Sequence, residues 1–93
     1  MEDNKLRAVS YCLYTSSNPD WEIVGNYEET EFDTMLEDAK NGKFDIILTK
    51  SISQFSENVV ELLTIVRDLR QHDVAVYFEE ESINTSALNS ELL

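Results

Sequence analysis

One short segment limits the fold more than any other part of the chain. The run Phe44-Asp45-Ile46-Ile47-Leu48-Thr49 is nearly continuously apolar, which is typical of a central strand that is covered on both faces of a sheet. A strand pattern lies before it at 21–28, where Trp21, Ile23, Gly25 and Tyr27 alternate with the other residues and are expected to form one buried face. Another strand pattern follows at 74–78. Helical patterns at about Thr30 to Lys40 and Asn58 to Gln71 separate these strands. This order predicts parallel neighbours joined by right-handed crossovers.

Both helical segments carry signals for where they begin and end. Thr30 is the expected N-cap of the first helix, and Asn41-Gly42 is its expected end. Asn58 with Glu61 three residues later resembles a capping box at the start of the second helix. Residues 51–56 are expected to form a loop. The side chains of the second helix that are expected to be buried are Val59, Leu62, Leu63, Val66 and Leu69.

The first strand, predicted from Leu6 to Tyr14, does not fit the alternating pattern. Only about six residues separate Tyr14 from Trp21, whereas a parallel crossover needs about a dozen or more. We therefore expect the first two strands to be antiparallel neighbours, or the first strand to be displaced in the sheet. Either arrangement leaves one sheet face without a covering helix near these strands, with an apolar patch for a partner or a second copy.

The charge of the chain excludes one class of function. Nineteen acidic and seven basic residues give a net charge of −12, whereas direct binding to nucleic acid needs a basic surface that neutralises phosphates. The charge instead suits a basic partner, including a protein that itself binds DNA or RNA. A purely solubilising role for the acidic residues is the alternative.

The remaining composition indicates a single domain, residues 1–93, with no appended DNA-binding domain. Cys12 is the only cysteine and His72 the only histidine, so we expect no disulfide within the chain, no metal site and no cofactor. The polar N-terminus and the absence of a long apolar window predict a cytoplasmic protein without a membrane segment.

Several segments resemble the catalytic domain of the serine recombinases (the resolvase and invertase family), especially the large recombinases of phages and conjugative elements. The segments are Lys43-Phe44-Asp45-Ile46-Ile47-Leu48-Thr49-Lys50-Ser51-Ile52-Ser53-Gln54-Phe55-Ser56-Glu57-Asn58, Val66-Arg67-Asp68-Leu69, Val74-Ala75-Val76-Tyr77-Phe78-Glu79 and Asn18-Pro19-Asp20-Trp21-Glu22. More weakly, residues 9–16 are similar to the family's first strand with its Tyr-x-Arg-x-Ser motif. The resemblance implies a small α/β domain of two or three layers, with a four-stranded, mostly parallel sheet and two main helices.

The resemblance also implies that the family's chemistry has been lost. That chemistry needs a serine nucleophile and several arginines around the phosphoryl group. Leu13 stands at the motif's arginine and Thr15 at the nucleophile, while the family's Arg-Phe-Ala-Arg is Gln54-Phe55-Ser56-Glu57 here, preceded by Ser53 where many members have Asp. The long helix that would follow the nucleophile is absent between Ser17 and Asn18. We therefore expect that the protein is not an enzyme.

Two hypotheses for function remain open. In the first, the protein inhibits a basic nucleic-acid-binding protein, such as a CRISPR effector, by presenting carboxylates in place of phosphates or by blocking its site, in the manner of anti-CRISPR proteins. In the second, it is a catalytically dead regulatory fragment, or a remnant, of a recombinase and associates with an intact one. We expect a monomer or a weak homodimer. The candidate partner-binding carboxylates are Glu28, Glu29, Glu31, Asp33, Glu37, Asp38 and Glu57, and the uncovered sheet face is the other candidate interface.

Overall fold

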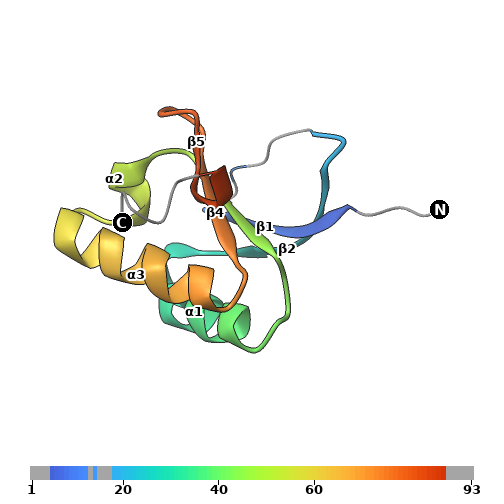
Figure 1. Ribbon diagram of the computed structural model, residues 1–93, viewed down its shortest axis with the longest axis horizontal. Coiled ribbons are helices and arrows are strands. Elements are labelled where there is room, and N and C mark those ends of the chain that lie inside the picture. Colours follow the sequence, from blue (N-terminus) through green and yellow to red (C-terminus); the bar gives the residue numbers. More distant parts are fainter. Residues whose placement is uncertain (1–4, 13, 15–17, 88–93) are drawn as a thin grey trace.

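The computed structural model describes residues 5–12, 14 and 18–87, and these form one sheet with helices packed against it (Figure 1). The apolar run becomes β3 (Ile46–Thr49), and all four of its side chains are buried. In the strand order β2-β1-β3-β4-β5, β3 is the middle strand, as the sequence predicts. Its neighbours are β1 (Leu6–Tyr11) and β4 (Ala75–Phe78). The outer strands are β2 (Trp21–Tyr27) and β5 (Ile83–Asn84).

The sheet has five strands instead of the predicted four, because the two-residue β5 follows a turn at 79–82 and pairs antiparallel with β4. A strand of two residues carries no periodic pattern that a sequence can reveal. The remaining pairs, β1 with β2, β1 with β3 and β3 with β4, are all parallel.

The prediction that the first two strands are antiparallel is wrong, because β1 and β2 pair in parallel. The predicted first strand ran to Tyr14, but β1 ends at Tyr11 and leaves residues 12–20 as the link. Nine residues reach roughly 30 Å when extended, and a six-residue strand is only about 20 Å long. A link of this length is therefore long enough to bring the chain back to the start of a parallel neighbour. β1 is placed between β2 and β3, out of its sequence position.

The helices follow the predicted bounds more closely than the predicted caps. The first helix is α1 (Phe32–Lys40), preceded by the 3-10 turn η1 (Glu29–Glu31). The N-cap assigned to Thr30 is wrong, since this residue lies inside the turn and α1 begins after Glu31. The Glu31 carboxylate accepts a hydrogen bond from the Glu28 backbone N–H at 2.8 Å. As predicted, Asn41 and Gly42 follow the end of the helix. The φ of Gly42 is 78°, a backbone conformation that favours glycine.

The second long helix, α3 (Val59–Gln71), is capped as expected, because the Asn58 side chain accepts a hydrogen bond from the Glu61 backbone N–H at 3.0 Å. The loop predicted at 51–56 is instead a one-turn helix, α2 (Ile52–Phe55). Its N-cap, Ser51, accepts a hydrogen bond from the Gln54 backbone N–H at 3.1 Å. The cap makes this short turn favourable although its sequence has no helical periodicity. A last 3-10 turn, η2 (Thr85–Ala87), follows β5.

The two long helices, α1 and α3, lie on the same side of the sheet (Figure 1), and α2 adds Phe55 to the core on that side, so the described residues form two layers. The main core between the layers takes Val9, Tyr11, Ile47, Val76 and Phe78 from the strands, and Met35, Ala39, Phe55, Leu62, Val66 and Leu69 from the helices. The predicted burial of Val59 and Leu63 is wrong, since they are 67% and 38% exposed. The buried stripe of α3 consists of Leu62, Val66 and Leu69. Leu63 lies one position off this stripe, whereas Val59 is the first residue of the helix.

The opposite face of the sheet carries no helix among the described residues, as expected. A smaller cluster lies there, formed by Ala8, Trp21, Ile46, Leu48 and Ala75, with Tyr14 and Tyr77 packed against it. Apolar exposure is confined to the β1–β2 end, where Leu6 and Ile23 are 41% and 43% exposed. The expected patch is therefore present, but small.

The alternation predicted for β2 is interrupted by a register shift against β1. Ala8 pairs with Ile23, but Val9 pairs with Gly25. Paired residues of parallel strands point to the same face, and Val9 faces the helices. Trp21 and Ile23 therefore point to the helix-free face, while Gly25 and Tyr27 point to the helices. The sequence had placed all four on one buried face.

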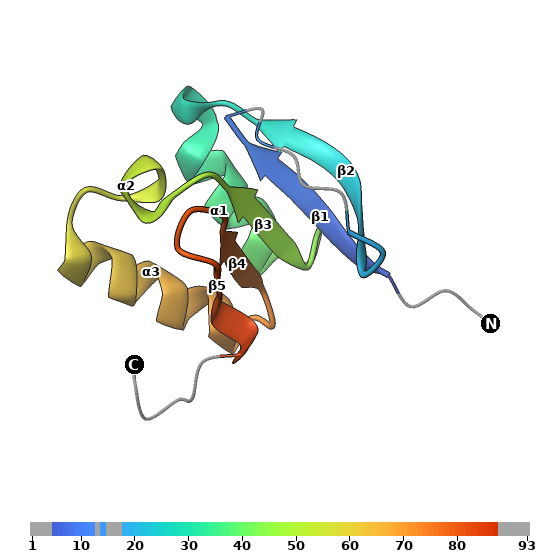
Figure 2. The same ribbon diagram turned by 90° about the horizontal axis from the view of Figure 1, so that it is seen from above.

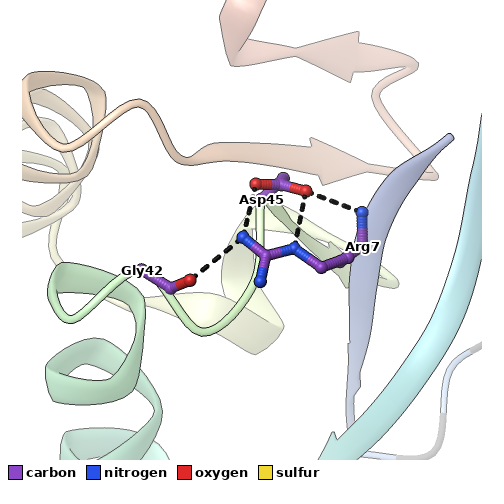
Figure 3. A network of polar contacts seen from close by, with 3 residues as sticks. All are labelled: Arg7, Gly42 and Asp45. Atoms are coloured by element: carbon purple, nitrogen blue, oxygen red, sulfur yellow. Dashed lines mark hydrogen bonds and ion pairs between the residues drawn. The ribbon is translucent and has the colours of Figure 1, made fainter. Parts of the chain in front are cut away.

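Arg7 and Asp45 clamp the edge of the sheet where β1 and β3 begin (Figure 3). The guanidinium donates hydrogen bonds to both Asp45 carboxylate oxygens, at 3.2 and 3.1 Å, and to the Gly42 carbonyl at 3.0 Å. The Arg7 backbone N–H also donates to the same carboxylate at 2.8 Å. Hydrogen bonding to Arg7 lowers the pKa of Asp45. This clamp ties the turn after α1 to the first strand.

Candidate functional site

A hollow of about 440 Å³ lies at the carboxyl ends of the parallel strands, between the start of α1, α2 and the start of α3. Figure 2 shows the arrowheads of β1, β2 and β3 directed toward this part of the molecule. This is the edge at which open parallel sheets usually bind ligands. The hollow is lined by Tyr11, Glu29, Phe32, Ser53, Gln54, Phe55, Ser56, Glu57, Glu61 and Ile65.

The floor of the hollow is aromatic. The Tyr11, Phe32 and Phe55 rings contact one another edge to face, with centroid separations of 5.1 to 6.1 Å. Tyr11 and Phe55 are almost fully buried, whereas Phe32 is half-buried. Burial, with the nearby Cys12 and Glu29, raises the pKa of Tyr11 to about 12. The phenol is therefore neutral at physiological pH and is not a ready base.

The walls of the hollow are acidic. Glu29 on η1, Glu57 in the α2–α3 link and Glu61 on α3 all line it, and all three side chains are exposed. No lysine or arginine is among the described lining residues. Three of the chain's cations are held elsewhere in ion pairs, Arg7 with Asp45, Lys40 with Asp68 and Lys43 with Asp38. The local field is therefore negative, and a phosphate would be repelled.

The structure brings together the positions that the recombinase resemblance identified in distant parts of the sequence. Ser53, Gln54 and Glu57 line the hollow beside Tyr11, the tyrosine of the Tyr-x-Arg-x-Ser motif. The Gln54 side-chain amide donates a hydrogen bond to the Cys12 sulfur at 3.5 Å. Burial raises the pKa of the Cys12 thiol, which keeps it protonated. The predicted positions Leu13 and Thr15 lie outside the described residues.

The acidic residues predicted as a partner surface are divided by the fold. Of the seven, only Glu29 and Glu57 line the hollow. Glu28 and Asp33 lie close by, on either side of η1, and the Glu31 carboxylate is engaged in the turn itself. Glu37 and Asp38 are in the last turn of α1, at the other end of the helix.

Asp38 is the most firmly held of these seven carboxylates. It accepts a hydrogen bond from the Tyr27 hydroxyl at 2.7 Å and lies 3.5 Å from the Lys43 ammonium. Its role as a partner-binding residue stays a prediction, but its geometry is that of a structural contact between β2 and α1.

Sequence reasoning missed Glu61 and the aromatic floor. Glu61 was interpreted only as a capping residue. Its backbone N–H donates the capping hydrogen bond to Asn58, which leaves its side chain free to point outward. The available signal was the spacing of Glu57 and Glu61, which lie on either side of the cap residue Asn58 at the start of the helix. The floor depends on Tyr11 and Phe55, which the fold brings together in the main core.

The described part of the chain shows neither a metal-binding cluster nor a membrane-spanning helix. No three His, Cys, Asp or Glu side chains within residues 5–12, 14 and 18–87 are grouped so as to hold a metal ion. In the same residues, no helix combines the length and the apolar character needed to cross a membrane.

A mostly parallel sheet with a β2-β1-β3-β4 core, helices on one face and a hollow at the strand ends defines a small α/β domain. The protein belongs to the resolvase family: the model of the resolvase N-terminal domain matches residues 12–93. This confirms the relationship that the sequence segments indicated. Among curated proteins, no match was found.

A solved structure gives independent support for the fold. The crystal structure of the N-terminal catalytic domain of TP901-1 integrase superimposes with a TM-score of 0.74, over 92% of this chain and 87% of that one. The two sequences are 17% identical, so the likeness extends to the fold alone. The chain therefore has a resolvase-like fold, as expected.

Proposed function

We propose that this protein is a non-catalytic member of the resolvase family that acts by binding the basic, DNA-contacting surface of an intact recombinase. The observation that carries the proposal is the negative charge of the residues that line the hollow. Glu29, Glu57 and Glu61 line it, and no described cation does. Family membership makes a recombinase the first partner to test.

The chemistry of the family supports the non-catalytic part of the proposal. Phosphoryl transfer by a serine recombinase needs a nucleophile and cationic groups that stabilise the developing charge. The positions that correspond to two arginines in the resemblance are Gln54 and Glu57, and both line the hollow. Such groups act as a unit, so losing several of them removes activity rather than reducing it slightly.

Supercoiled DNA provides the test of inertness. The protein is incubated with plasmid carrying candidate crossover sites, and we expect neither nicks nor a covalent protein–DNA adduct on denaturing gels. An intact recombinase on its own site is the positive control. Any adduct formed by the wild-type protein would contradict the proposal.

Competition provides the test of binding. A resolvase-type recombinase is titrated onto its labelled DNA site in the presence of this protein, at low and at high salt. We expect the apparent affinity for DNA to fall at low salt and to recover as salt screens the contact. The variant Glu29→Gln, Glu57→Gln, Glu61→Gln should compete less well than the wild type. Its control is Asp20→Asn, Glu22→Gln, Asp73→Asn, which changes the net charge equally at exposed positions beside the amino ends of β2 and β4. Unchanged affinity for DNA at all salt concentrations would refute this partner.

A second candidate function is inhibition of an unrelated nucleic-acid-binding protein, such as a CRISPR effector. The net charge of −12 favours it, because total charge attracts any basic groove. The same competition assay with an effector and its guide RNA separates the two. If instead a partner holds its nucleic acid and this protein together without loss of affinity, the exposed Leu6 and Ile23 on the helix-free face become the better interface.

A further inference from the structure

We propose that the hollow receives one arginine side chain of the partner protein, with the guanidinium held between the three carboxylates and over the aromatic floor. This inference rests on the proposed function and names the group that is bound. Its basis is the combination of a hollow that has an aromatic floor with charge complementarity, rather than the acidic residues alone.

The three carboxylates come from separate elements and approach one space from different sides. Glu29 lies after β2, Glu57 lies before α3 and Glu61 lies within its first turn. Within the described part of the chain, none of these carboxylates has a hydrogen-bond or ion-pair partner. Asp38, Asp45 and Asp68, by contrast, are each paired with a cation of the chain itself. The carboxylates of the hollow are thus available to an incoming cation.

The floor favours a guanidinium over an ammonium. A planar, weakly hydrated guanidinium stacks on aromatic rings and donates two parallel hydrogen bonds to a carboxylate, whereas an ammonium is a compact and strongly hydrated charge. Phe32 is the ring of the floor that is only half-buried, so it is the one that offers a surface. The volume of about 440 Å³ falls within the ~300–1,000 Å³ of ligand pockets.

The surroundings favour an arginine that is part of a protein. Ile65 lines both the hollow and a second depression between α1 and α3, which also contains Leu36 and Leu69. A polypeptide that inserts its arginine has apolar surface beside the hollow on which neighbouring residues can pack. A second copy of this chain is a poor occupant, because two molecules of net charge −12 repel each other.

The experiment uses peptides as probes, because they isolate the cation from any particular partner. Hexaarginine, hexalysine and hexacitrulline are titrated into the isotope-labelled protein at about 50 mM salt, and backbone amide shifts are followed by NMR. We expect hexaarginine to shift the amides of Tyr11, Phe32, Gln54 and Ser56 more than those of residues 20–22. Hexalysine should bind at least about threefold more weakly, and hexacitrulline should not bind.

Two variants test the assignment to the hollow. Glu29→Gln, Glu57→Gln, Glu61→Gln keeps the shape and removes the charge, and we expect hexaarginine binding to weaken about tenfold. Gln54→Arg supplies a guanidinium from the protein itself, and we expect it to weaken binding as well. The control Asp20→Asn, Glu22→Gln, Asp73→Asn carries the same net charge as the first variant, at exposed positions, and should weaken binding less than about twofold.

The outcomes are distinct for the two proposals. Equal weakening by both triple variants, or shifts centred on another surface, would overturn the arginine site and leave the competition with a recombinase untouched. Specific binding of hexaarginine in the hollow, combined with no effect on a recombinase, would keep the site and reject the proposed partner. Equal affinity for hexaarginine and hexalysine would reject the preference for a guanidinium.

Discussion

Replacing Ile47 with Ala tests whether the middle of the sheet holds the domain together. Ile47 is fully buried at the centre of β3, where it faces the helices. The substitution removes three carbon atoms, each worth about 0.8 kcal/mol of transfer free energy, and leaves a cavity that the packed helices close only in part. Such changes cost roughly 2–5 kcal/mol, and the central position favours the upper half of that range.

This loss is large for a chain of 93 residues, since domains are stable by roughly 0.05–0.15 kcal/mol per residue. We expect Ile47→Val to cost only about 0.5–1.5 kcal/mol. Leu63→Ala is the matched control on the exposed side of α3, where 38% of the residue is accessible, and it should cost less than about 1 kcal/mol.

Urea unfolding followed by the fluorescence of Trp21, the single tryptophan, measures all three variants. Trp21 is buried on the helix-free face, so it reports unfolding without touching the substituted sites. The midpoint should move while the dependence on urea stays constant. A loss below about 1 kcal/mol for Ile47→Ala, or an equal loss for Leu63→Ala, would refute the packing described above.

Three further predictions concern helix ends and the Arg7–Asp45 clamp. Asp73 follows the end of α3 with a φ of 62°, a left-handed conformation that costs free energy for any residue except glycine. Asp73→Gly should therefore stabilise the fold by about 0.5 kcal/mol in urea unfolding. Gly42→Ala, at a φ of 78°, should destabilise it by about 1 kcal/mol. Removing the cap of α3 with Asn58→Ala should cost about 1 kcal/mol and reduce its helicity by circular dichroism; no change would mean that the cap contributes nothing. Because the folded-state pKa of Asp45 is lowered by Arg7, its contribution to stability is present at neutral pH and is lost as the pH falls below about 4. Asp45→Asn should therefore lose less stability than the wild type between pH 5 and pH 2, by under about 1 kcal/mol because the pair is partly exposed; parallel pH profiles would contradict this.

Local signals in the sequence predicted the helices and the central strand well. The bounds of α1 and α3 and the place of β3 follow from hydrophobic periodicity and from single residues such as Asn58 and Gly42. Where one residue decides between two local conformations, prediction was weaker. Thr30 was predicted to be the N-cap of α1, but the turn from Glu28 to Glu31 makes such a cap unnecessary. Ser51 begins a helical turn that the hydrophobic periodicity does not predict.

The candidate site shows the same division. Ser53, Gln54 and Glu57 were identified through the recombinase resemblance, and Glu29 because it belongs to an acidic run. Their meeting with Tyr11, Phe32 and Glu61 in one hollow depends on α1, α2 and α3 packing on the same face. No local pattern specifies which side chains of different elements face each other.

The sequence alone determined the family, through the resemblance of its segments. It also determined the alternation of strands and helices and the acidic charge, because these follow from short-range spacing and from composition. Only the tertiary structure decided that β1 lies parallel to β2 and between β2 and β3, since a link of nine residues permits either direction. It also decided which carboxylates are free. Asp38 and Asp45 are neutralised by cations of the chain itself, whereas Glu29, Glu57 and Glu61 surround one open space. Charge can be counted along a chain, but a binding site depends on which charges the fold leaves unpaired and close together.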